Sequence, residues 1–212
     1  IINYIALLGW SPGGEQEIFS LSELAEAFDL DGISKSPSIF DNEKLTWMNA
    51  QYISRMDTDE FLERAKPYFD EALKGEFDRR FIAELLQPRL ETLAQIPEKI
   101  SFLSQMPDYD IELYTHKKMK TNPEISLPIL EGLLPVMESQ EDYSAAALHD
   151  AVMDYIKTTG EKNGKILWPL RIAITGTKVT PGGAFEAAAL LGKDETLRRL
   201  RLSIDKLKSS IS

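Results

Sequence analysis

The stretch YSAAALHDAVMDYIKTTG, residues 143–160, carries the clearest structural signal in this chain. Leu148, Val152 and Ile156 recur every four positions, which places all three on one face of a helix. Gly160 follows, at the position where a helix C-terminus favours a left-handed residue. The pattern therefore predicts an amphipathic α-helix that is closed by Gly160.

Helical periodicity continues on both sides of this stretch. Upstream, Ser20 and Glu23 have the spacing of a capping box before an apolar pattern. Downstream, the last segment has apolar residues at spacings of 3, 4 and 3: Leu197, Leu200, Ile204 and Leu207. Prolines recur beside the helical patterns and favour short helices: Pro67, Pro88, Pro97, Pro123, Pro128 and Pro135. We therefore expect an all-α fold, a compact assembly of short helices.

One segment is ambiguous. KILWPLRIAITG, residues 165–176, is rich in Ile, Leu and Trp and is compatible with a short buried strand. Pro169 weakens that interpretation, because proline cannot donate a hydrogen bond to a sheet. Proline is also favoured in the first turn of a helix, so PLRIAITG could be two helical turns closed by Gly176. Periodicity alone leaves both interpretations open.

Composition limits the classes of function. The 212 residues are 43% hydrophobic and 27% charged, as expected for a chain that buries a real core. Cysteine is absent, which excludes disulfides, thiol catalysis and thiolate metal sites. No apolar run approaches the roughly 18 residues of a membrane helix, and the opening IINYIALLGW does not resemble a signal peptide. We expect a cytoplasmic protein without membrane contact, and a fragment of a longer chain, because an apolar helix opens it without an initiating Met.

Charge is unevenly distributed along the chain. The net charge of −10 argues against a nucleic-acid partner. However, residues 162–201 hold eight basic and three acidic residues, whereas residues 1–31 hold six acids and no Lys or Arg. A solvated basic face is the simpler interpretation of the C-terminal excess. We interpret the arginines near the end in the same way, as a solvated helix face rather than specific contacts: Arg198, Arg199 and Arg201.

No pattern indicates catalysis or metal binding. His116 and His149 are 33 residues apart, and neither lies beside an Asp/Glu pair at metal spacing. We therefore expect no catalytic residue and no metal ligand. GISKSPSIF, residues 32–40, partly matches the KMSKS signature that holds ATP in class I aminoacyl-tRNA synthetases, but Gly32 replaces the first lysine, and Pro37 favours a plain loop.

Four segments carry a resemblance to a known family. IFDNEKLTWMNAQYI (residues 39–53) and the upstream NYIALLGWSPGGEQEIFSLSEL (3–24) resemble bacterial glutamyl-tRNA synthetases after their catalytic domain. WPLRIAITG (168–176) and TPGGAFEAAALLGKDETLRRL (180–200) are similar to their C-terminal subdomain. The resemblance runs in order along essentially the whole chain. It implies that residues 168–176 are helical, and that Ser34-Lys35 lies outside the ATP site.

The resemblance also implies a division of the chain and an activity for the parent enzyme. Residues 1–55 would form a stem-contact region, and residues 56–108 and 109–212 two subdomains of an α-helical anticodon-binding domain. The parent attaches glutamate to tRNA(Glu) with ATP and Mg²⁺ in an N-terminal catalytic domain that is missing here. This fragment would hold no cofactor, act as a monomer that binds tRNA(Glu), and show no ATP–pyrophosphate exchange by itself.

The family's pattern assigns the candidate site residues. Arg89, directly after the helix-breaking proline of QPRLETL, would read the third anticodon base. The other anticodon contacts would come from the PLR arginine and the Thr-Pro turn: Arg171, Thr180 and Pro181. Because TPGGAF stands where some members have TPGLF, either Gly183 or Ala184 fills the apolar contact position. Lys44 is a candidate phosphate contact in the tRNA stem, whereas Trp47 and Met48 are expected in the core.

Two alternatives remain open. A non-discriminating member of the same family also charges tRNA for glutamine, and the sequence does not separate it. The second alternative is an acidic helical protein-interaction module with no RNA role, as the net charge suggests. Binding of transcript tRNA at two salt concentrations separates this module from the RNA-binding interpretation, because phosphate-driven binding weakens steeply with salt.

Overall fold

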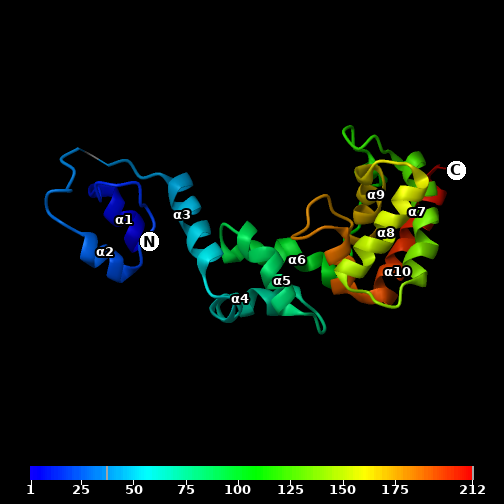
Figure 1. Cartoon of the computed structure of the whole chain (residues 1–212), viewed down its shortest axis with the longest axis horizontal. Helices are drawn as coiled ribbons and strands as arrows, with labels where there is room; N and C mark the ends of the chain where they lie inside the picture. The colour runs from blue at the N-terminus through cyan, green and yellow to red at the C-terminus, as the bar shows by residue number, and fades with distance from the viewer. Residues whose placement is uncertain (37, 212) are drawn as a thin grey trace.

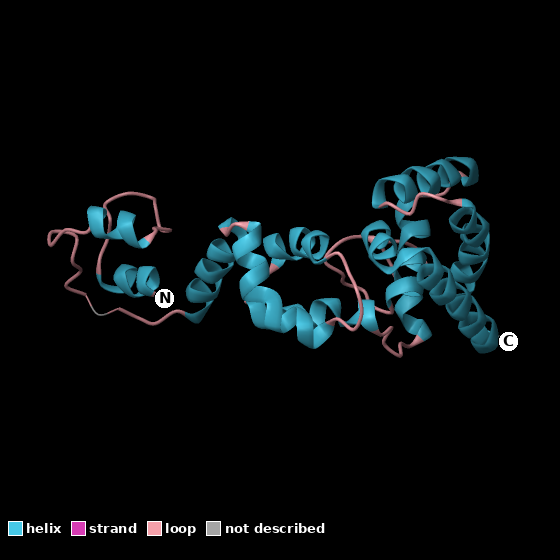
Figure 2. Cartoon of the chain, turned by 90° about the horizontal axis from the view of Figure 1, so that it is seen from below, coloured by secondary structure: helices cyan, strands magenta, loops and turns pink. Residues whose placement is uncertain are grey.

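The computed structural model describes residues 1–36 and 38–211. Pro37, from which a loop was predicted, lies outside the described residues. Helices form the described part, and its only β-type contacts are two isolated bridges, Trp10 with Ile33 and His116 with Thr121. The all-α prediction is confirmed (Figure 2). The helices are α1 Ile2–Gly9, α2 Leu21–Ala27, α3 Asn42–Arg55, α4 Thr58–Ala72, α5 Arg79–Leu86, α6 Ile96–Ser104, α7 Pro123–Ser139, α8 Ala145–Thr159, α9 Asn163–Thr175 and α10 Ala184–Ile211, with the 3-10 turns η1 Gln87–Arg89, η2 Leu93–Gln95 and η3 Ile111–Tyr114.

Groups of helices follow one another along the long axis of the molecule (Figure 1). α1 and α2 lie at one end around a small cluster of Trp10, Phe19 and Leu24. α3 leads to the middle group, α4 to α6, and α7 to α10 form the other end. One continuous hydrophobic core extends from Ile53 at the end of α3 to Leu207 in α10. The predicted boundaries at residues 55 and 108 stay predictions.

Local sequence accounts for the helix ends. The predicted capping box forms, because Glu23 N–H donates to the Ser20 hydroxyl and Ser20 N–H donates to the Glu23 carboxylate. Gly160, with φ of 69°, closes α8 in the left-handed conformation. The α8 residues Leu148, Val152 and Ile156 are buried. The helix predicted from residues 143–160 is therefore confirmed.

Prolines do not all mark helix starts. Pro97 and Pro123 lie in the first turns of α6 and α7, as expected. Three others lie inside helices, Pro67 in α4 and Pro128 and Pro135 in α7, which is 17 residues long. Each interior proline removes one hydrogen bond of its helix. Packing against the common core compensates for that loss, so proline spacing underestimated the length of α7.

The ambiguous segment is helical. α9 spans Asn163–Thr175, and Gly176, with φ of 66°, closes it through its N–H on the Ile172 carbonyl. Pro169 lies in the helix interior, so α9 begins six residues earlier than the two-turn alternative supposed. Apolar residues are buried around much of the α9 circumference, and such a helix lacks the polar stripe that periodicity detects. This is why the segment was compatible with a buried strand.

Arg199 is a structural residue and not part of a solvated face. Its side chain is 1% exposed. Its Nη1 donates to the carbonyls of Phe102 (2.7 Å) and Ile174 (3.0 Å), and its Nη2 donates to the carbonyl of Leu103 (3.0 Å). Nε donates to the Glu195 carboxylate at 2.6 Å. The prediction for Arg199 is therefore wrong, because its position on α10 faces the ends of α6 and α9.

The two neighbouring arginines behave as the sequence predicted. Arg198 and Arg201 are exposed and pair with the carboxylates of Glu195 and Glu138. Gly192, with φ of 75°, interrupts α10 upstream of these arginines. The chain therefore changes direction at Gly192 before the segment that carries Arg199 enters the core.

We expect Arg199→Met to lower the free energy of unfolding by about 3–5 kcal/mol, because it leaves three buried carbonyls and Glu195 without their donor. Arg198→Met is the matched control, since its exposed ion pair contributes about 0–1 kcal/mol. Urea denaturation of both variants measures the difference. Equal destabilisation by the two substitutions would contradict a structural role specific to Arg199.

Stability should also depend on the ionisation of Glu195. The hydrogen bond from Arg198, together with Arg199, lowers the pKa of Glu195 to about 2, against the opposing effect of burial. Because the folded-state pKa is depressed, the ionised carboxylate stabilises the fold above its usual pKa of 4.5, and this contribution is lost as pH falls from there toward 2. Urea denaturation of wild type and Glu195→Gln should give a stability gap that is full at pH 7 and narrows over that window. A gap that is constant with pH would contradict the assignment.

Candidate nucleic-acid interface

Arg89 lies where α5 ends. Pro88 lacks an N–H, and the chain tightens there into the 3-10 turn η1. The Arg89 side chain is exposed, and its Nη1 donates to the Leu85 carbonyl at 2.7 Å. Its other N–H groups have no hydrogen bond within the described residues. The guanidinium is thus held at one edge and presents its remaining donors to solvent.

Gln87 fixes the base of this turn, a role that sequence reasoning missed. Its buried Nε2 donates to the carbonyls of Ile53 (2.9 Å) and Met56 (2.5 Å), at the end of α3. These bonds satisfy carbonyls that the helix end leaves without partners. A polar residue directly before the helix-breaking proline was the available signal.

Arg171 lies on α9 and reaches toward the turn that follows it. The side chain is half-buried, and Nη1 donates to the Lys178 carbonyl at 3.3 Å. Burial lowers the pKa of the Arg171 guanidinium, and the charge of Glu186 opposes that shift. The group still carries its charge at neutral pH, because arginine starts from a pKa above about 12. Arg171 therefore both orders the turn and places a cation beside it.

The turn from Thr180 to Gly183 is tightly folded. The Thr180 hydroxyl donates to the Gly182 carbonyl. Pro181 and Ala184 are buried, whereas Thr180 and Gly183 are half-exposed. A Cβ on Gly182 would lie 2.7 Å from the Glu186 Cβ, so glycine is required there by the close approach of Glu186. Of the candidate turn residues, only Thr180 and Gly183 present part of their surface to a ligand.

Glu186 caps the start of α10. α10 begins at Ala184, and Gly183 N–H donates to Glu186 Oε2 at 2.7 Å. The Gly183 N–H is therefore already paired within the fold. Gly183 precedes α10, and Glu186 follows it by three residues, which is the spacing of the glutamate in a capping box. This spacing could have revealed the contact.

The segments that carry the two groups of candidate residues pack together at one contact between helices. Leu85, whose carbonyl holds Arg89, lines a small apolar hollow together with Thr180, Pro181 and Gly182. Residues of α6 and α10 close the hollow: Ile100, Phe102, Leu103, Ala187 and Leu190. Arg89 and the Thr180 turn therefore flank a common contact, although 91 positions separate them along the chain.

Lys44 is not brought to this contact. It lies on α3, and its Nζ forms an ion pair with Glu17 near the N-terminal cluster. The expectation for its neighbours is half right, since Met48 is 1% exposed but Trp47 is 43% exposed. Adjacent helical residues point about 100° apart. α3 buries only one face, and Trp47 lies outside it.

The described residues contain no group of three or more His, Asp or Glu side chains that could hold a metal ion. His116 packs edge-on against Trp168, and His149 lies beside Asp150 and Phe185.

Within residues 1–36 and 38–211, no helix is both long and apolar enough to span a membrane.

Curated proteins similar to this chain are glutamate–tRNA ligases. The chain is 51% identical to that of Clostridium acetobutylicum over 209 residues, which cover 98% of this chain and 43% of the relative. It is 50% identical to that of Clostridium tetani over 212 residues, which cover 100% of this chain and 43% of the relative. The chain therefore spans less than half the length of these relatives.

A solved structure is similar as well. The crystal structure of a glutamate tRNA ligase from Elizabethkingia meningosepticum, in complex with its amino acid, matches with a TM-score of 0.85 and 28% identity. The match covers 97% of this chain and 40% of that chain. The likeness therefore extends over almost the whole fold described above.

Two family models match the sequence. The catalytic domain of class I tRNA synthetases (E and Q) matches residues 1–47. The model described as anticodon binding domain matches residues 60–204, which include Arg89, Arg171 and the Thr180 turn. Because this second match covers more than half of the chain, the protein belongs to the anticodon binding domain family.

Proposed function

We propose that this chain is the tRNA-recognising part of a glutamate–tRNA ligase and binds the anticodon of tRNA(Glu). The observation that carries the proposal is the packing of Leu85, whose carbonyl accepts from Arg89, beside the Thr180 turn that Arg171 contacts, within the match to the anticodon binding domain. In the longer protein, we propose that the catalytic part uses ATP with Mg²⁺ to attach glutamate to tRNA, in the cytoplasm and as a monomer.

The chemistry of the site suits single-stranded RNA. Unpaired bases are recognised by hydrogen bonds to their Watson–Crick edges. Arg89 presents a fork of donors at the end of α5, and Arg171 places a second cation beside the turn. Thr180 adds a hydroxyl that can donate or accept. A site with donors at two separated positions could bind more than one base of an anticodon loop.

The N-terminal region would serve the tRNA stem. Lys44 is the proposed phosphate contact, and the partly exposed Trp47 lies one turn along the same helix. In the structure, Lys44 pairs with Glu17, so contact with a phosphate requires exchange of this partner. Exposed ion pairs of this kind contribute about 0–1 kcal/mol, which makes the exchange inexpensive.

Thr180→Ala and Arg171→Ala should each weaken binding of transcript tRNA(Glu) by about 1–3 kcal/mol, because each removes a group proposed to contact a base. Arg201→Ala removes an equal charge from an exposed residue of α10 and should have little effect. Fluorescence titration measures affinity, and circular dichroism checks the helix content. Equal loss of affinity for every RNA tested would indicate phosphate contact or misfolding instead of base contact.

Arg89→Gln should weaken discrimination at the third anticodon base by about 1–3 kcal/mol, mostly by admitting G. Cytosine offers two adjacent acceptors, which suit the forked donors of arginine. Guanine presents donors over the corresponding region and leaves Arg89 without partners, whereas glutamine can both donate and accept. Binding of wild type and variant to two transcripts that differ only at this base measures the effect.

Arg64→Gln is a matched control for that experiment, because Arg64 is an exposed arginine of α4 that pairs with Glu60. It should retain the preference of the wild type. If the wild type binds both transcripts equally, the chain resembles the non-discriminating alternative. If Arg89→Gln keeps the full preference for C, another residue reads the base.

A further inference from the structure

Basic residues gather in two stretches, and the second of them also includes Arg171 of the proposed anticodon site. Residues 116–123 hold three lysines and no acid, and residues 162–185 hold four cations and no acid. The chain as a whole carries a net charge of −10. A local excess of this kind in an acidic protein concentrates positive potential where an anion could bind.

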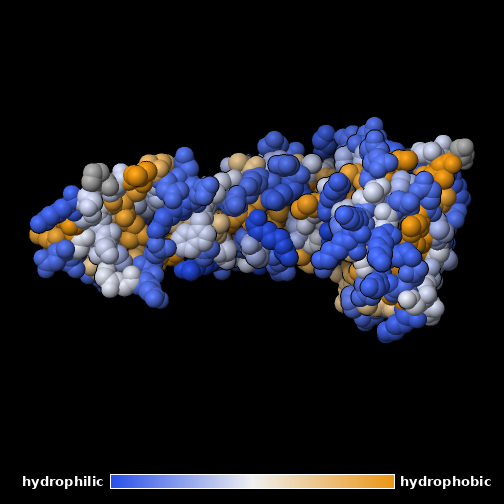
Figure 3. Space-filling view, turned by 90° about the horizontal axis from the view of Figure 1, so that it is seen from above, coloured by the Kyte–Doolittle hydropathy of each residue, from blue (hydrophilic) through white to orange (hydrophobic). Residues whose placement is uncertain are grey.

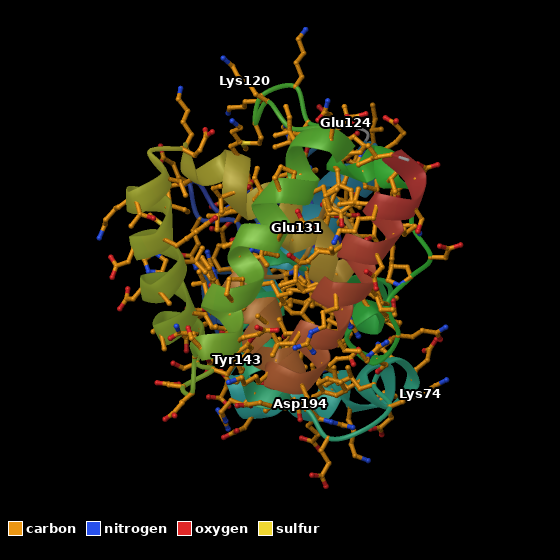
Figure 4. The ribbon with its side chains drawn as sticks, turned by 90° about the vertical axis from the view of Figure 1, so that its right-hand side faces the viewer. Lys74, Lys120, Glu124, Glu131, Tyr143 and Asp194 are labelled. Carbon is orange, nitrogen blue, oxygen red and sulfur yellow. The ribbon has the colours of Figure 1, made fainter. Side chains whose placement is uncertain are left out.

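The first stretch is a short hairpin between η3 and α7, and we call it the lysine hairpin: Lys117, Lys118 and Lys120. His116 and Thr121 exchange two backbone hydrogen bonds at its base, 3.0 and 3.3 Å long. Lys120 has a left-handed φ of 57°, which allows the tight return. Figure 4 shows Lys120 on a loop that extends outward from the group of helices α7, α8, α9 and α10.

The base of the lysine hairpin is held firmly against the fold. The Thr121 hydroxyl, which is buried, donates to the Tyr114 carbonyl at 2.8 Å. The His116 ring packs edge-on against Trp168 with centroids 4.3 Å apart, and Trp168 Nε1 donates to the Leu113 carbonyl at 3.0 Å. These contacts hold the backbone of the lysine hairpin in place, so the hairpin loses less conformational entropy when a ligand binds.

The second basic stretch begins beside the hairpin. Met119 packs on the first turn of α9, where a Cβ on Gly164 would overlap the Met119 Sδ. The side chain of Lys162, at the N-cap of α9, belongs to the same end of the molecule. From there α9 runs to Arg171 and the Thr180 turn. Its 13 residues span about 20 Å, so the lysine hairpin and the candidate anticodon site lie at opposite ends of one helix.

The lysines have no competing partners. Lys117, Lys118, Lys120 and Lys162 are exposed, and none has an ion pair within residues 1–36 and 38–211. The nearby acid Glu161 is engaged by Lys165. At the α7 to α10 end, the face that Figure 3 shows carries many hydrophilic residues interspersed with hydrophobic patches.

We propose that the lysine hairpin and Lys162 bind phosphates of the RNA strand that flanks the anticodon. This inference rests on the proposed function, because α9 joins these cations to the candidate anticodon site over about 20 Å. Phosphate contacts position a nucleic acid without reading its sequence. The hairpin would therefore strengthen binding of every tRNA equally, whereas Arg89 and the Thr180 turn would select among them.

The salt dependence of binding tests the proposal. Lys117→Gln/Lys118→Gln is compared with the wild-type chain and with Lys66→Gln/Lys74→Gln, a control that removes the same charge from exposed residues of the α4 region. Each variant is titrated with tRNA(Glu) transcript and with a transcript altered in the anticodon, over salt from about 50 to 200 mM. Circular dichroism checks that all three chains fold.

Each phosphate contact contributes about 0.7–0.9 to the slope of log affinity against log salt, so the hairpin variant should lose about 1.4–1.8 from that slope. Its preference between the two transcripts should stay that of the wild type, and the control should keep the wild-type slope. Lys162→Gln should lose about half as much.

An unchanged slope in the hairpin variant, or an equal loss in the control, would overturn the proposal while the anticodon preference stands. Failure of the proposed function gives a different result, since the wild type would then bind neither transcript. That result would overturn both proposals and would favour the acidic interaction module. If the wild type binds both transcripts equally, the proposed anticodon discrimination fails, whereas the slope of the hairpin variant still decides the lysine proposal.

Discussion

The arrangement of the molecule depends on one buried cation. Arg199, on α10, donates to carbonyls at the ends of α6 and α9, and Glu195 balances its charge. A helix end leaves its last carbonyls without partners, and a charged donor is a strong way to satisfy them. α6 follows the turn that carries Arg89, and α9 carries Arg171. The guanidinium therefore fixes the spacing of the two groups that we propose as base readers.

Charge is segregated in a way that reconciles an acidic protein with an anionic ligand. Many cations are used within the fold, as in the pairs of Arg198 with Glu195 and Arg201 with Glu138. Within residues 1–36 and 38–211, the cations without an ion pair include the lysine hairpin, Arg171 on α9 and Arg89 after α5. Because screening limits the reach of each exposed charge to about 8 Å in physiological salt, the local pattern of charge matters more than the net charge.

The candidate site shows where sequence reasoning reached its limit. The family resemblance proposed Arg89, Arg171 and Thr180 as anticodon contacts, and these stay predictions. It did not indicate Glu186, whose carboxylate accepts a hydrogen bond from the Gly183 N–H. Trp47 was expected in the core because tryptophan is usually buried, yet only the Met48 face of α3 packs. Arg199 was expected in solvent because arginine usually is. Residue type predicts only average burial. Trp47 and Arg199 depart from that average because burial depends on which other helices pack against each position.

The sequence by itself determined the all-α class, the capping box at Ser20, the end of α8 at Gly160 and the family, because these depend on neighbouring residues and on short motifs. The tertiary structure alone decided that Pro169 lies inside α9, that Arg199 is buried and that the Thr180 turn packs beside Leu85. These features depend on contacts between residues tens of positions apart. The spacing of residues along the sequence does not predict such contacts, because each contact forms only when several helices pack in one core.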